Sequence, residues 1–172
     1  MHIFKQAAFA FISLACIGAA DSTFADSTRD IGAISTEFKL LGPNHKIVVS
    51  AFTDPKVKGV TCYIARPRTG GIKGGLGLAE DPSIASVSCV QTGAITYSDS
   101  IEPGEKGEEV FDESRSFIFK TLKINRLYDQ ENGSLIYVAR TTKIINGSPM
   151  TAISVVAPAS WNGTPAQKPA LK

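Results

Sequence analysis

Two long segments rich in β-branched and aromatic residues, 116–128 and 134–145, restrict the fold more than any other feature of the sequence. Residues of this kind favour extended strands. The five residues between the segments include Asn132 and Gly133, a dipeptide that is typical of tight hairpin turns. The sequence therefore predicts a long antiparallel hairpin, and with it a mostly β fold.

The first arm of this hairpin contains a break in its alternation. Its apolar positions shift from Phe117 and Phe119 to Leu122 and Ile124, and a β-bulge near residues 120–121 accounts for such a shift. A helix over the same arm remains the alternative, because short apolar segments do not separate the two structures by pattern alone.

Further segments with strand character recur along the chain, with turn residues between them. They are 34–41, 46–53, 57–65, 86–91 and 152–156, and two loops are expected at 67–82 and 98–109. The sequence shows no internal repeat and no second domain. We therefore expect a single-domain antiparallel sandwich or barrel-like sheet, with a long hairpin and a glycine-rich loop.

Residues 1–25 have the organisation of an export signal. Lys5 precedes an uncharged apolar run of 14 residues at 7–20, which is shorter than the roughly 20 residues that span a bilayer. Small residues then follow, and we expect cleavage after Ala25, with cleavage after Ala20 as an alternative. Lipidation of Cys16 and a buried N-terminal helix are two less favoured interpretations of the same segment.

Cleavage at this position leaves one β domain at 26–156 and a segment at 157–172 that we expect to be a flexible tail. That last segment has three prolines and no acid, a composition typical of unstructured chain ends. The signal contains one Lys and one Asp, so the net charge remains +2 after cleavage. Such a balance argues against nucleic-acid binding, and no other segment is apolar enough to cross a membrane.

Two cysteines, Cys62 and Cys89, remain after cleavage and lie on apolar faces of predicted strands. An even number of cysteines in an exported chain favours a disulfide. There is no C-x-x-C pattern, so thioredoxin-like chemistry has no support. One histidine, His45, and two paired cysteines do not supply the ligands of a zinc site, and neither a metal nor a cofactor is predicted.

The glycine-rich loop is the most distinctive candidate for a site, although it matches no complete nucleotide-binding motif. Residues 70–75 have the glycine spacing of a P-loop, but Leu76 occupies the lysine position. Residues 75–77 begin a dinucleotide-binding fingerprint, but Glu80 replaces its third glycine. Both motifs therefore fail.

An anion site is the functional hypothesis for this loop. Its backbone N–H groups can form a concave nest for an anion, and the segment 55–79 contains five cations and no acid. The predicted ligand-binding residues are Arg66, Arg68, Gly70, Gly71, Lys73, Gly74, Gly75 and Gly77. The alternative is a solvated loop in which glycines allow tight turns.

Segment 99–113 has the opposite charge, with seven acids and one lysine. It lacks the spacing of an EF-hand loop. We expect a solvated loop, or one that pairs with the basic segment 55–79.

Three stretches of the sequence resemble the CreA family of small exported bacterial proteins. They are residues 38–83, SFIFKTLKINRLYD at 116–129 and KIINGSPMTAIS at 143–154, and the run TGGIKGGLGLAEDPS and the two-cysteine layout are the most specific features. The resemblance covers about residues 31–156 and implies a periplasmic protein. The family has no assigned catalytic or ligand residues to transfer, and its label suggests carbon-catabolite regulation.

The expected function is that of a periplasmic accessory or binding protein that recognises an anionic small molecule or an envelope component through residues 66–73. An exported, near-neutral β domain is unsuited to act on DNA. Enzyme activity is not the leading expectation. The alternatives are a hydrolase that uses His45 or a nearby acid, and a structural partner of another envelope protein.

Overall fold

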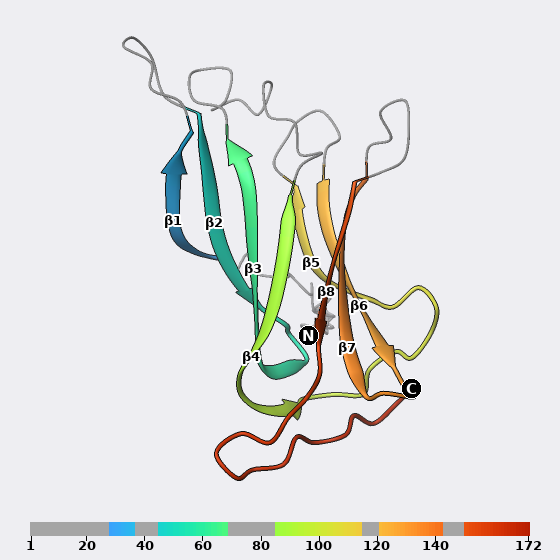
Figure 1. Ribbon diagram of the computed structural model, residues 1–172. Coiled ribbons are helices and arrows are strands. Elements are labelled where there is room, and N and C mark those ends of the chain that lie inside the picture. The colour runs from blue at the N-terminus through green and yellow to red at the C-terminus, as the bar shows by residue number, and fades with distance from the viewer. Residues whose placement is uncertain (1–27, 37–44, 69–84, 115–120, 143–149) are drawn as a thin grey trace, which may run out of the picture.

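The computed structural model describes residues 28–36, 45–68, 85–114, 121–142 and 150–172 (Figure 1). These residues form eight strands and no helix. The strands are β1 (Arg29–Ser35), β2 (Lys46–Thr53), β3 (Val57–Arg68), β4 (Ser86–Tyr97), β5 (Glu108–Ser114), β6 (Thr121–Asp129), β7 (Ser134–Thr141) and β8 (Thr151–Val156).

The strands form two antiparallel sheets of four, in the orders β1-β2-β3-β4 and β5-β6-β7-β8. Figure 1 shows these sheets facing one another as two layers. The mostly β fold and its sandwich form are confirmed, and the described strands form no closed barrel. The predicted hairpin is β6–β7, and Gly133 in its turn has a φ of 68°. β6 is a strand rather than a helix, and the bulge expected near 120–121 falls at the boundary of the described residues.

The core lies between the sheets, where alternate side chains of the strands are buried. The rings of Phe52 on β2 and Phe111 on β5 pack with centroids 4.7 Å apart. Cys62 and Cys89 lie directly opposite one another on β3 and β4 and form the predicted disulfide within this core. Closing a loop of this length stabilises a fold by about 3–4 kcal/mol on the chain-entropy model.

The edges of the two sheets meet along β4 and β8. The backbone N–H of Cys89 donates to the hydroxyl oxygen of Ser154 at 2.7 Å, so a side chain of β8 satisfies the backbone of β4. Buried ion pairs connect the sheets elsewhere, from β3 to β5 and from the β2–β3 turn to β6. Side-chain chemistry therefore holds together two layers that share no backbone ladder among the described strands.

Strand β5 was not predicted, because all but the last residue of its sequence EEVFDES belong to the acidic segment 99–113, which was expected to be a loop. A register shift between Glu109 and Phe111 breaks the alternation of the strand. Val110 and Phe111 are therefore both buried although they are neighbours. A search for period-two alternation does not detect such a strand.

Other strand boundaries also differ from those expected. β1 begins at Arg29 rather than at residue 34, while residues 37–44 lie outside the described ranges. β3 continues to Arg68, so Arg66 and Arg68 both belong to this strand, although the loop was expected to begin at residue 67. β4 continues to Tyr97, past a register shift opposite Gly59.

The segment expected to be a flexible tail, 157–172, runs across one end of the strands (Figure 1). The N–H of Gln167 donates to the carbonyl of Ile95 at 3.1 Å, and the N–H of Ile101 donates to the carbonyl of Ala170 at 3.0 Å. Ile101 is fully buried, and Ala166 packs against the core. The last residues of the chain therefore contribute to the interior.

Candidate functional site

A pocket of about 260 Å³ lies on β1, β2 and the end of β3. Its lining residues are Asp30, Gly32, Ala33, Lys46, Val48 and Arg68. The strand registers explain this grouping, because Ala33 pairs with Val48 and Lys46 pairs with Arg68. Paired residues of neighbouring strands point to the same face of a sheet.

Two cations are adjacent at one end of this pocket. Lys46 and Arg68 are direct register partners, and within the described ranges neither forms an ion pair. The Nε atom of Arg68 is buried and has no hydrogen-bond partner among the described residues. The end of the pocket at Lys46 and Arg68 therefore presents positive charge with which no described acid forms an ion pair, while the acid of the lining, Asp30, lies further along β2 at its register partner Ser50.

Arg66 lies two residues before Arg68 on β3 but has different surroundings. It is 9% exposed, forms an ion pair with Glu113 of β5 and donates to the hydroxyl oxygen of Ser50 at 3.2 Å. A buried arginine requires such compensation, because an unpaired charge in the interior is costly. Of the two predicted arginines, Arg66 cross-links the sheets and Arg68 lines the pocket.

The other predicted ligand residues, Gly70, Gly71, Lys73, Gly74, Gly75 and Gly77, lie outside the described residues. His45 lies directly before β2, and its carbonyl accepts a hydrogen bond from Thr36 at 2.9 Å. Sequence reasoning missed Lys46 and Asp30, because their contribution depends on the pairing of β1 with β2. The expectation that the acidic segment pairs with the basic one is met by Arg66–Glu113 and Lys56–Glu108.

A buried ionic network lies at the opposite end of β3. Nη1 of Arg126 donates to both carboxylate oxygens of Asp54 at 2.6 Å, and the two side chains are 1% and 0% exposed. The hydroxyl of Tyr137 donates to the same carboxylate at 3.0 Å. Two backbone N–H groups, of Lys56 and Val57, donate to it at 2.9 and 3.1 Å. The buried carboxylate of Asp54 therefore has all the partners it requires.

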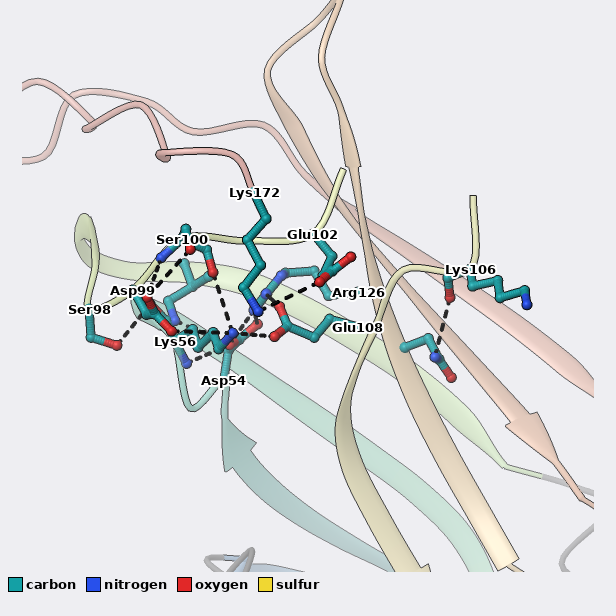
Figure 2. Close-up of polar contacts among 12 residues, drawn as sticks. Asp54, Lys56, Ser98, Asp99, Ser100, Glu102, Lys106, Glu108, Arg126 and Lys172 are labelled. Carbon is teal, nitrogen blue, oxygen red and sulfur yellow. Dashed lines mark hydrogen bonds and ion pairs between the residues drawn. The ribbon is translucent and has the colours of Figure 1, made fainter. Parts of the chain in front are cut away.

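The network continues to the surface through Glu108 (Figure 2). Glu108 accepts hydrogen bonds from both Arg126 and Lys56, and Nζ of Lys56 also lies 3.6 Å from Asp99. The hydrogen bond with Glu108 raises the pKa of Lys56 above its ordinary value, against the opposing effect of burial. Alternating charges thus extend from the core to the solvent.

Two tyrosines beside this network remain neutral at physiological pH. Burial raises the pKa of Tyr97 to about 12, and burial together with the Asp54 carboxylate raises the pKa of Tyr137 further above its ordinary value. A general base must lose its proton near the working pH, so neither phenol is suited to that task. The network is suited to holding the sheets together.

The described residues contain neither a group of three or more His, Cys, Asp or Glu side chains placed to hold a metal ion nor a helix long and apolar enough to cross a membrane. Both statements apply to the ranges described above.

Two comparisons with known proteins, one with family models and one with individual sequences, indicate the same family. A family model described as CreA protein matches residues 31–161. The Protein CreA sequences of Escherichia coli strains K12 and O157:H7 are each 53% identical to this chain over 134 residues, which cover 77% of this chain and 85% of theirs. No solved structure matches the chain.

Proposed function

The chain belongs to the CreA family, and from that premise we propose that it is an exported periplasmic protein that binds a ligand with an anionic group. The organisation of residues 1–25 supports export. The disulfide between Cys62 and Cys89 supports an oxidising compartment, because disulfides are rare in reducing ones.

The pocket on β1–β3 is the observation on which the anionic ligand depends. Lys46 and Arg68 lie side by side there without a described acid to neutralise them. Arginine and lysine form charge-assisted hydrogen bonds with carboxylates and phosphates. A volume of about 260 Å³ admits a small molecule rather than a folded partner. We further propose that Lys73 and the glycines of residues 70–77, which follow Arg68 in the sequence, add to the attraction, whereas the charge of Arg66 is paired with Glu113. A role in carbon-catabolite regulation would then act through this ligand rather than through DNA.

Binding of small anions by variants of the purified protein tests this function. We expect native mass spectrometry or calorimetry to detect binding of at least one of inorganic phosphate, a sugar phosphate or a short carboxylate. The variant Lys46→Ala/Arg68→Ala should bind it at least tenfold more weakly, since each charge-assisted contact is worth about 1.5–3 kcal/mol.

Lys58→Ala is the matched control, because Lys58 is an exposed cation on the same strand β3 outside the pocket. It removes the same kind of charge and should bind as the unmodified protein does. Equal affinity of the double variant and the control, or no binding of any of these anions, refutes the proposal.

A second candidate function is that of a structural partner of another envelope protein. An exposed apolar face on the second sheet favours it. Ile153 and Val155 of β8 are 65% and 55% exposed, and their register partners on β7 are Val138 and Ile136. An apolar surface of this kind is a common feature of protein interaction sites. Failure of the anion test places this role ahead of ligand binding.

A further inference from the structure

The pocket has an acid at the end opposite its two cations. Asp30 lines the pocket and pairs with Ser50 of β2, whereas Lys46 begins that strand. The four residue steps from Lys46 to Ser50 span about 13 Å in an extended strand. Among the residues that the structure describes, Asp30 has no ion-pair partner. The pocket is therefore an elongated site with opposite charges at its two ends.

We propose that its ligand is an elongated zwitterion with the dimensions of a short peptide, its carboxylate at Lys46 and Arg68 and its ammonium group at Asp30. This inference rests on the proposed anion-binding function and adds the second charge. An elongated dianion would place negative charge beside Asp30, which is unfavourable. Three extended residues span at most about 10–11 Å, and the side chains at the two ends of the pocket close the remaining distance.

The middle of the pocket suits a small uncharged segment. Ala33 and Val48 pair across β1 and β2 between the charged ends, and Gly32 lies beside them. Gly32 has no side chain, so only its backbone lines the pocket. These residues provide apolar contact without hydrogen-bonding groups on their side chains, which favours alanine-like residues in the ligand.

Calorimetric titration with trialanine and its two blocked forms separates the two charges. We expect the unmodified protein to bind trialanine at least tenfold more tightly than N-acetyl-trialanine, which lacks the ammonium group, or trialanine amide, which lacks the carboxylate. In Asp30→Asn the preference for trialanine over its acetylated form should disappear. In Arg68→Gln the preference for trialanine over trialanine amide should fall in the same way.

A steric variant tests the location. Ala33→Leu adds bulk on the face that Ala33 shares with Val48 and should weaken trialanine binding at least tenfold. Ile34→Phe adds bulk at the next residue, which is 66% exposed and points to the opposite face, and should leave binding unchanged. Circular dichroism and thermal unfolding show whether each variant is folded.

The outcomes distinguish the two proposals. If N-acetyl-trialanine binds as tightly as trialanine and Asp30→Asn has no effect, the zwitterion is refuted while anion binding stands. If no peptide binds but a phosphate or carboxylate binds in a manner dependent on Arg68, the zwitterion is again refuted. If neither the peptides nor the simple anions bind, both proposals are refuted.

Discussion

At the scale of single residues, the most informative position is Arg126, a charge in an apolar series. Leu122, Ile124 and Arg126 occupy alternate positions of β6, and all three are buried. The alternation in the sequence indicates that the guanidinium of Arg126 is buried, and a buried guanidinium requires a carboxylate partner. The sequence does not identify this partner, because Asp54 lies 72 residues away.

The two tyrosines of the network should respond in opposite ways to loss of their hydroxyl groups. Tyr137→Phe removes a hydrogen bond to a buried carboxylate and should lower the free energy of unfolding by about 1.5–3 kcal/mol. Tyr97→Phe removes a buried hydroxyl that has no partner among the described residues, so it should be neutral or stabilising. Urea unfolding at pH 7 measures both, and equal losses would contradict the assignment.

The same tyrosines make stability fall in alkali. The pKa of Tyr97 is raised from 10.0 to about 12, and that of Tyr137 is raised further. Above pH 10 the unfolded chain therefore releases protons that the folded chain retains, and the free energy of unfolding decreases. The contribution of Tyr97 to the free energy of unfolding is complete below pH 10 and is lost as the pH rises towards 12. When urea unfolding is repeated at several pH values from 10 to 12, Tyr97→Phe should show a shallower decline than the unmodified protein.

At the scale of the strands, a bulge determines how β3 and β4 fit together. The register shifts between Lys58 and Val60, where Gly59 adopts a φ of 82°. A Cβ atom at Gly59 would clash with the backbone carbonyl of Ala94. Both the backbone conformation and the close approach of β4 therefore require glycine.

Gly59→Ala should accordingly destabilise the fold by more than about 2 kcal/mol, since strain at a positive φ and a backbone clash act together. Gly104→Ala is the matched control, because a Cβ atom there meets nothing within 4 Å and Gly104 has no positive φ. Thermal or urea unfolding compares them. Similar stability of the two variants would show that the bulge tolerates a side chain.

Local signals account for the elements that could be predicted, and non-local pairing accounts for those that could not. The β6–β7 hairpin has alternation and turn residues within its own sequence, and Cys62 and Cys89 each lie on an apolar strand face. β5 escaped detection because its bulge places Val110 and Phe111 together in the core. Arg68 was identified from its place beside the glycine-rich segment. The pocket was not identified, because Asp30 and Lys46 meet Arg68 only through the registers of β1, β2 and β3.

At the scale of the whole molecule, the C-terminal segment contributes to the core between the two sheets. Deleting residues 167–172 removes the backbone bonds to Ile95 and Ile101. Exposing a buried isoleucine costs about 1.5–3 kcal/mol, so the deletion should lower the free energy of unfolding by at least that amount. Lys172→Ala, which removes only an exposed ion pair with Glu102, should cost less than about 1 kcal/mol. Urea unfolding of both variants checks this, and equal stability would mean that the segment only rests on the surface.

The contact of Ile101 with residues 170–172 also bears on the order in which the fold forms. Leu171 lies 70 residues after its bridge partner Ile101 in the sequence. Contacts between residues so far apart cost more chain entropy to form than local contacts do. We therefore expect this end of the sandwich to close late in folding, after the local hairpins have formed.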